Sequence, residues 1–160
     1  MSMPEIYIFP IKALLSMTDF PENTIAIINS SEPVNTEALI VPHCAVCYQD
    51  LDYESPRSFT PELAQQIANF VRKHRDPIHH IFVCCQAAQS RSPGIAAALY
   101  TYYGLDPLEI FSQPQYHPNV LCYRLLTEAF GIQIQDYQID TLLHANDKAF
   151  KNALAKGRRP

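Results

Sequence analysis

The first third of the chain alternates short apolar runs with residues that favour turns. The apolar runs are short, and prolines and small polar residues separate them. Such runs are typical of strands in a buried sheet, although an apolar run alone does not exclude a buried helix segment. The pattern predicts four strands, at residues 6–9, 24–28, 38–41 and 45–48.

Apolar residues then recur at helical spacing. Thr60 is suited to a helix N-cap and Pro61 to the first helical position. Leu63 and Ile67 begin an apolar stripe directly behind them. The pattern predicts a helix over residues 61–74.

The second half of the chain contains one more apolar run and three helical patterns. Gly104 and Gly131 follow two of these patterns, as glycines at helix ends commonly do. Strands followed by a helix, a strand and further helices are typical of an α/β domain. We therefore expect a central, mostly parallel sheet flanked by helices. The predicted elements are a strand at 81–84 and helices at 93–103, 119–130 and 140–155.

Length and composition fit one domain that spans residues 1–160. The chain is nearly half apolar and long enough to bury a core. Its formal net charge of -4 offers no broad basic field, so we expect no nucleic-acid partner. No apolar run approaches the ~18 residues that a membrane span needs, and the N-terminus lacks the pattern of a secretory signal.

The cysteine count bears on the cellular compartment. Five cysteines, an odd number, do not suggest a disulfide framework. We therefore expect a protein of the reducing cytoplasm, with no membrane partner. The sequence alone leaves the oligomeric state open.

The segment from Cys85 to Ser92 lies between the strand predicted at 81–84 and the helix that follows. Free backbone N–H groups and the partial positive charge of a helix N-terminus favour anions, and a loop in front of it can aim several amides at one phosphate. Arg91 adds a planar cation that matches two phosphate oxygens. The same positive field favours the thiolate of Cys85, a nucleophile that can attack phosphorus and form a phosphocysteine.

Residues 83–99 resemble the Cys-x5-Arg signature of the protein tyrosine/dual-specificity phosphatase superfamily. The closest likeness is to small bacterial members, whose loop reads His-Cys-x-Ala-Gly-x-Ser-Arg-Ser or Thr before an Ala-rich helix. Weaker similarities extend the resemblance over about residues 5–131, whereas 132–160 form a C-terminal helical extension without a matched counterpart. The resemblance implies the phosphatase fold and a hydrolase that needs no metal or other cofactor. Its substrate would be a phosphorylated protein, through phosphotyrosine or phosphoserine/threonine, or a small phosphomonoester.

The resemblance also assigns roles to single residues. Cys85 matches the nucleophile, Arg91 the phosphate-binding arginine and Ser92 the hydroxyl beside the thiolate. Asp50 matches the aspartic acid that protonates the leaving oxygen and then activates water, and Asp52 is the alternative acid. The residues assigned to phosphate binding are Gln86, Ala87, Ala88, Gln89, Ser90 and Arg91.

Two positions depart from the family pattern. Cys84 stands where the family has histidine, and Ala88 where it has a glycine that lets the backbone approach phosphate. A phosphate-binding pseudophosphatase with little or no turnover is therefore an alternative. A second alternative is a cysteine redox or metal protein, suggested by Cys44, Cys47 and the adjacent pair at 84 and 85.

Overall fold

The computed structural model describes residues 3–74 and 77–157. Its strands form one sheet with the order β1-β4-β2-β3, and every pairing in it is parallel. All four carboxyl ends therefore meet at one edge of the sheet. The strands are β1 (Glu5–Pro10), β2 (Thr24–Ser30), β3 (His43–Cys47) and β4 (His80–Cys85).

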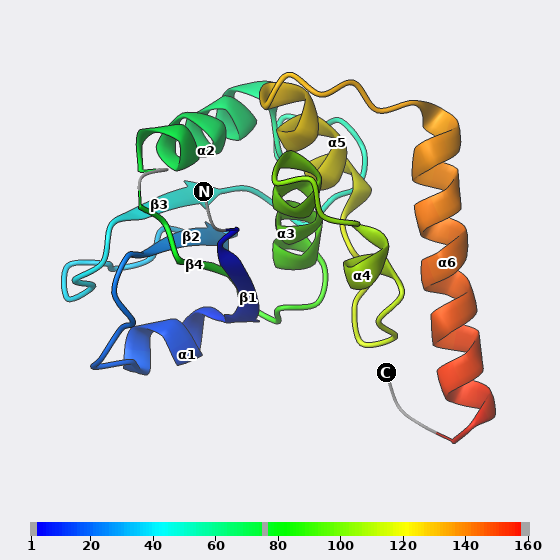
Figure 1. Ribbon diagram of the computed structural model, residues 1–160, viewed down its shortest axis with the longest axis horizontal. Helices are drawn as coiled ribbons and strands as arrows, with labels where there is room; N and C mark the ends of the chain where they lie inside the picture. The colour runs from blue at the N-terminus through cyan, green and yellow to red at the C-terminus, as the bar shows by residue number, and fades with distance from the viewer. Residues whose placement is uncertain (1–2, 75–76, 158–160) are drawn as a thin grey trace.

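Helices cover both faces of this sheet (Figure 1). α2, α3 and α5 pack on one face and α1 on the other, while α4 lies between α3 and α6. The helices are α1 (Ile11–Ser16), α2 (Pro61–Lys73), α3 (Arg91–Tyr102), α4 (Leu108–Phe111), α5 (Val120–Ala129) and α6 (Asp136–Ala155).

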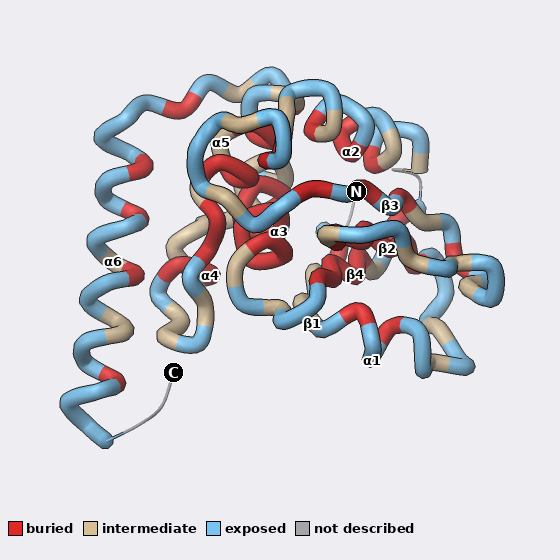
Figure 2. The backbone as a smooth tube through the Cα atoms, turned by 180° about the vertical axis from the view of Figure 1, so that it is seen from behind, coloured by how far each residue is buried: buried red, intermediate tan, exposed pale blue. Residues whose placement is uncertain are grey.

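The core follows the alternation of side chains along the two central strands. Ile27 and Val83 face the layer of α2, α3 and α5, whereas their neighbours Ile28 and Cys84 face α1. Buried positions are concentrated in the central strands and in α3 (Figure 2). Burial on both faces explains why these strands are continuous apolar runs in the sequence.

The predicted α/β architecture with a central parallel sheet is confirmed. The strands predicted at 6–9, 24–28, 45–48 and 81–84 and all four predicted helices are present, with ends shifted by up to four residues. Thr60 is the N-cap of α2, where its Oγ1 accepts a hydrogen bond from the Leu63 backbone N–H at 3.2 Å. α1 and α4 were not predicted, because helices of six and four residues carry too little periodicity.

The strand predicted at 38–41 is wrong. Residues 37 and 38 form a turn in which the Leu39 N–H donates to the Thr36 carbonyl, and Ile40 is 77% exposed. The chain joins the sheet only at Pro42, whose carbonyl accepts from the Ala26 N–H. Since proline has no N–H, it cannot continue a ladder from the preceding run.

No helix within residues 3–74 and 77–157 combines the length and the apolar character needed to cross a membrane.

Candidate active site at the carboxyl edge of the sheet

The loop from Cys85 to Ser90 connects the end of β4 to the start of α3. Cys85 is the last residue of the strand and is 2% exposed, and Arg91 opens the helix and is 7% exposed. Gln86 to Ser90 lie nearer the surface. The thiol therefore lies at the base of a loop whose rim faces solvent.

Ser92 provides two groups to the Cys85 sulfur. Its Oγ lies 2.8 Å from Sγ, and its backbone N–H donates to Sγ at 3.4 Å. A backbone N–H and a hydroxyl group beside one sulfur, at the positive end of α3, are groups that can stabilise negative charge there. The Ser92 hydroxyl thus lies beside the thiol, at the position that the sequence resemblance implies.

The backbone amides of the loop make no hydrogen bond to the described residues. In the part of the chain that the structure describes, the backbone N–H groups of residues 86–90 donate to no protein acceptor. Free amides in a loop that leads into a helix N-terminus are groups able to bind an anion. The six-residue phosphate-binding set predicted from the sequence coincides with this loop and the first residue of α3.

Arg91 is held at the side of the loop by backbone and side-chain acceptors. Its Nη1 donates to Ser31 Oγ and to the Tyr48 carbonyl, both at 3.0 Å, and its guanidinium carbon lies 5.8 Å from the centre of the Tyr48 ring. Its Nη2 donates to Gln86 Oε1. Of the three residues that accept from Arg91, Gln86 is the exposed one.

Ala88 adopts a left-handed backbone conformation with φ of 55°. A residue with a side chain at such a φ costs roughly 1–2 kcal/mol relative to the right-handed region. Glycine has no Cβ atom and avoids this cost. This conformation gives the physical reason for glycine at this position of the family loop. The loop is formed here despite the methyl group.

Asp50 and Asp52 differ in their relation to the loop. Oδ1 of Asp50 accepts a hydrogen bond from Ser90 Oγ at 2.8 Å and from Asn119 Nδ2 at 2.9 Å. Asp52 is exposed, and its side chain makes no hydrogen bond to another described residue. The geometry thus brings Asp50, rather than Asp52, to the rim of the loop.

Asn119 holds three segments together, a role that the sequence pattern did not reveal. The side chain is 3% exposed and donates to Asp50 and to the Leu51 carbonyl, while its Oδ1 caps α5 by accepting from the Cys122 N–H. Its own N–H donates to the Ser90 carbonyl at 2.9 Å. The helix-capping position of an asparagine was the available signal, but capping alone does not indicate contact with a distant carboxylate.

Tyr48 and Asn29 form a second buried support behind the loop. Tyr48 Oη donates to Asn29 Oδ1 at 2.8 Å, and Asn29 Nδ2 donates to the Cys84 carbonyl at 3.2 Å. Burial raises the pKa of Tyr48 well above its ordinary value, so the phenol stays neutral and remains a donor. Asn29 lies near the end of β2, the strand beside β4, and Tyr48 directly follows β3, the next strand in the sheet. Only the sheet order reveals that the two residues lie close together.

The remaining cysteines do not converge on one site. Cys84 points into the layer beneath α1, where burial raises its pKa, and Cys44 is buried while Cys47 on the other face of β3 is exposed. All five cysteines are free thiols. Among the described residues, no group of three or more potential ligands from His, Cys, Asp and Glu is arranged to hold a metal ion.

An apolar groove of about 540 Å³ adjoins the loop. Gln86 forms one end of it, and Ile11, Lys12 and Leu15 of α1 line it together with Val34. A separate pocket of about 590 Å³ lies at the opposite edge of the sheet.

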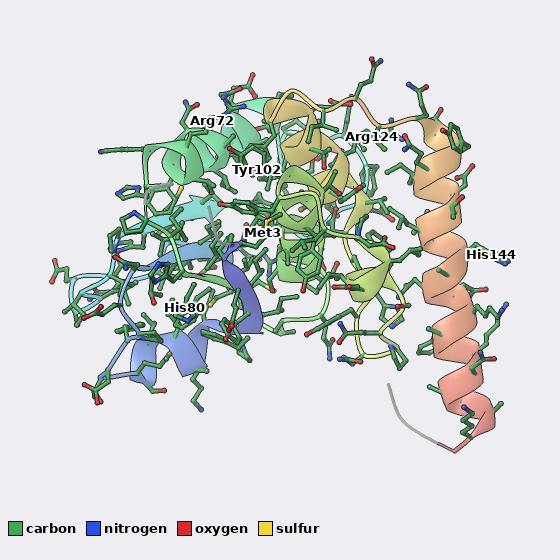
Figure 3. All side chains as sticks on the ribbon, viewed as in Figure 1. Met3, Arg72, His80, Tyr102, Arg124 and His144 are labelled. Carbon is green, nitrogen blue, oxygen red and sulfur yellow. The ribbon has the colours of Figure 1, made fainter. Side chains whose placement is uncertain are left out.

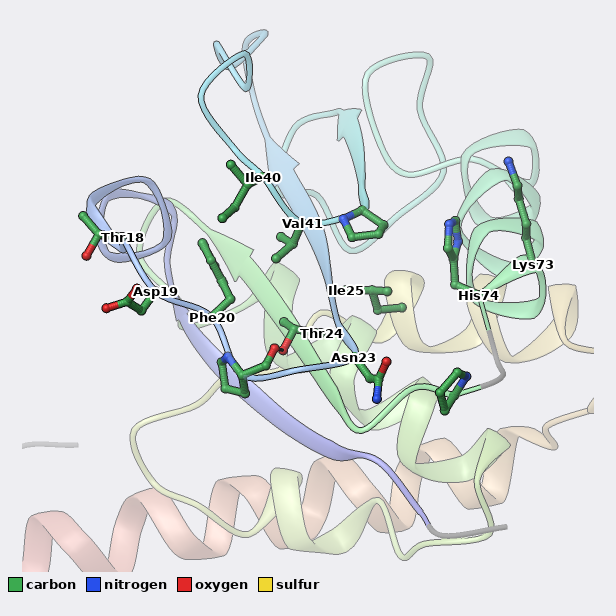
Figure 4. Close-up of a pocket in the computed structure, with 13 residues that line it drawn as sticks. Thr18, Asp19, Phe20, Asn23, Thr24, Ile25, Ile40, Val41, Lys73 and His74 are labelled. Carbon is green, nitrogen blue, oxygen red and sulfur yellow. Dashed lines mark hydrogen bonds between the residues drawn. The ribbon is translucent and has the colours of Figure 1, made fainter.

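Figure 4 shows this second pocket. Thr24 and Ile25, at the start of β2, lie between Ile40 on one side and His74 on the other. The groove at Gln86, and not this pocket, is therefore continuous with the candidate site.

No protein-family model matches the chain, and no curated protein matches it. The solved structures that are similar to it include three that are dual-specificity or tyrosine phosphatase-like. DUSP15 is 17% identical, with 93% of this chain and 92% of that chain covered and a TM-score of 0.59. Human DUSP28 is 12% identical, with 96% of both chains covered and a TM-score of 0.49. PTPMT1 is 18% identical, with 94% of this chain and 95% of that chain covered and a TM-score of 0.45.

The likeness to DUSP15 extends over nearly the whole of both chains. It shows that the chain has the dual-specificity phosphatase fold, as the sequence resemblance implied.

Proposed function

We propose that the protein hydrolyses phosphomonoesters through a phosphocysteine intermediate on Cys85. The observation that carries the proposal is the run of five unbonded backbone N–H groups between Cys85 and α3. Beside them lies Arg91, a buried cation with one nitrogen bonded only to a displaceable side chain. A phosphate in this loop would be surrounded by donors and would have the thiolate directly beneath its phosphorus.

In the first step the Cys85 thiolate attacks phosphorus. The S–P bond forms while the bond from phosphorus to the ester oxygen breaks, and the leaving oxygen takes a proton from an acid. In the second step water attacks the phosphocysteine, the same group accepts its proton, and the S–P bond breaks. Ser92, whose hydroxyl lies 2.8 Å from Sγ, stabilises the departing thiolate.

We assign the acid to Asp50. Its hydrogen bond to Ser90 places the carboxyl group at the rim of the loop, where the ester oxygen of a bound phosphate would face it. Asn119 holds the carboxyl group in this place from the other side. Asp52, the alternative acid by sequence position, lacks both contacts.

The substrate class follows from the same geometry. A phosphorylated protein or a small phosphomonoester would bind its phosphate in the loop, and the groove beside Gln86 offers apolar surface to the organic part. The five free thiols and the need for a reduced nucleophile are compatible with a cytoplasmic reaction.

A second candidate is phosphate binding without turnover. It is favoured by Ala88, whose left-handed conformation makes this loop more costly to form than one with glycine. In this case the loop and Arg91 would bind a phosphorylated partner, and Cys85 would not complete the reaction.

The test compares hydrolysis of an aryl phosphate by the wild type with hydrolysis by Cys85→Ser and Arg91→Lys. We expect Cys85→Ser to lose turnover and retain phosphate binding. Arg91→Lys keeps the charge but loses the planar fork, so we expect it to lose both. Equal turnover by the wild type and Cys85→Ser would refute the phosphocysteine mechanism, and phosphate binding without any wild-type turnover would favour the second candidate.

A further inference from the structure

The loop from Cys85 to Ser90, here called the phosphate loop, depends on hydrogen-bond donors from other segments of the chain. When the amides of a loop face an anion, its carbonyl groups face away and need partners of their own. The His117 N–H donates to the Gln89 carbonyl at 2.8 Å, and the Asn119 N–H donates to the Ser90 carbonyl at 2.9 Å. The segment that includes His117 and Asn119 therefore fixes the half of the loop next to Arg91.

This supporting segment is irregular and is bonded by a side chain from α6. Asn146 is 7% exposed, and its Nδ2 donates to the Phe111 carbonyl at 2.9 Å and to the Tyr116 carbonyl at 2.7 Å. One amide group thus ties the two ends of residues 111–116 together. The Tyr116 carbonyl and the His117 N–H belong to the same peptide unit, so this unit accepts the bond from Asn146 and donates the bond to the phosphate loop.

α6 is itself anchored against the rest of the protein. Ile139 and Leu142 are buried in the main core, and Figure 2 shows that buried positions recur on only one side of the helix. At its start, Arg124 and Asp136 form an ion pair of 2.8 Å, and Figure 3 shows Arg124 on α5 directed toward α6.

The phenyl ring of Phe150 meets the ring of His117 edge to face, with 5.1 Å between the ring centres. In contrast, His144 points away from the protein (Figure 3). The face of α6 that carries Asn146 and Phe150 is therefore the one that meets the supporting segment.

We propose that Asn146 is a positioning residue for the phosphate loop, acting through residues 111–119. The inference rests on the proposed phosphate site and adds that the C-terminal helix is part of its support. Asn146 does not meet substrate. It fixes the backbone that directs the loop carbonyls outward, and this keeps the loop amides directed at the phosphate.

The experiment measures inorganic phosphate affinity in the full chain carrying Cys85→Ser, alone and combined with Asn146→Leu. Leucine is close to asparagine in size and has no donor. We expect phosphate to bind at least about 10-fold more weakly, because a displacement of about 1 Å in a binding site can cost up to 100-fold. Asn152→Leu is the matched control, since Asn152 lies exposed on the same helix.

Two further readouts separate positioning from loss of folding. Amide hydrogen exchange should become faster at His117 and Asn119 and remain unchanged in β2 and β4. In the otherwise wild-type chain, kcat/KM for an aryl phosphate should fall with Asn146→Leu and not with Asn152→Leu. If Asn146→Leu does not fold, Asn146→Asp keeps the size and shape while removing both donors, and should give the same loss.

The outcomes separate this inference from the proposed function. If the Cys85→Ser chain itself binds no phosphate, the proposed site is wrong and the positioning role is refuted with it. If that chain binds phosphate and a folded Asn146 variant binds it equally well, only the positioning role is refuted.

Discussion

Gly94 occupies the position where α3 comes closest to the start of α5. A Cβ atom at Gly94 would lie 2.4 Å from the Asn119 carbonyl oxygen and 3.1 Å from Cβ of Cys122. Ordinary van der Waals contact begins at 3.4 Å, so Gly94→Ala would push Asn119 away by about 1 Å. Because Asn119 bonds both Asp50 and the Ser90 carbonyl, this displacement would reach the acid and the phosphate loop together.

The energetic effect has two opposing parts. Alanine is favoured over glycine inside a helix by about 1 kcal/mol. Overpacking against a backbone that cannot rotate away costs about 1–3 kcal/mol. We therefore expect Gly94→Ala to lower the free energy of unfolding by up to about 2 kcal/mol. A shift of about 1 Å near the reacting groups should lower kcat/KM by about 10- to 100-fold.

Urea denaturation and aryl phosphate hydrolysis measure the two effects separately. Gly104→Ala is the control, because Gly104 has φ of 76° and no neighbour within 4 Å. Strain at that φ should cost about 1–2 kcal/mol without moving the site. If Gly94→Ala and Gly104→Ala lose stability alike and neither loses activity, the coupling through Asn119 is wrong.

Three further predictions follow from the site. Ala88→Gly relieves a left-handed alanine and should raise the free energy of unfolding by about 0.5–1 kcal/mol in urea denaturation; a loss of stability would contradict the assigned conformation. Asp50→Asn should slow hydrolysis of alkyl phosphates more than of nitrophenyl phosphate, whose leaving group needs no proton, and Asp52→Asn should slow neither. The reverse result would move the acid to Asp52. Burial raises the pKa of Cys84, so at pH 8 it should remain a thiol and resist iodoacetamide, whereas Cys85 should be alkylated unless phosphate is present. Peptide mapping by mass spectrometry checks this, and labelling of Cys84 instead would count against the assigned environments.

The sequence predicted the elements whose pattern is complete within a short window. The strands at 24–28 and 81–84 are continuous apolar runs because they are buried on both faces, and the helix that begins at Pro61 has its own cap and apolar stripe. The run at 38–41 has the same composition as a strand but pairs with no strand of the described sheet. Its burial is decided by tertiary contacts, which local pattern does not contain.

In the candidate site, too, the sequence predicted what depends on local pattern and missed what depends on tertiary contacts. Cys85, Arg91 and Ser92 are close in sequence, so their placement around one loop could be predicted from the strand and helix on either side. Asn119 and Asn146 themselves lie at least 29 positions along the chain from the loop that they support. The role of such a buried amide depends on which backbone carbonyl groups lack a donor in the folded protein. The sequence alone does not show which carbonyl groups these are.

The central claim is that the phosphoryl group is transferred first to Cys85 and only then to water. The most direct test is rapid acid quenching of a reaction of the Asp50→Asn variant with an aryl phosphate, followed by peptide mass spectrometry. Asp50→Asn retains the nucleophile and should slow the attack of water, so the intermediate should accumulate. We expect one phosphoryl group on the peptide that carries Cys85 and none when Cys85→Ser is added. Turnover with no phosphoryl group on that peptide, or with one on another residue, would contradict the account.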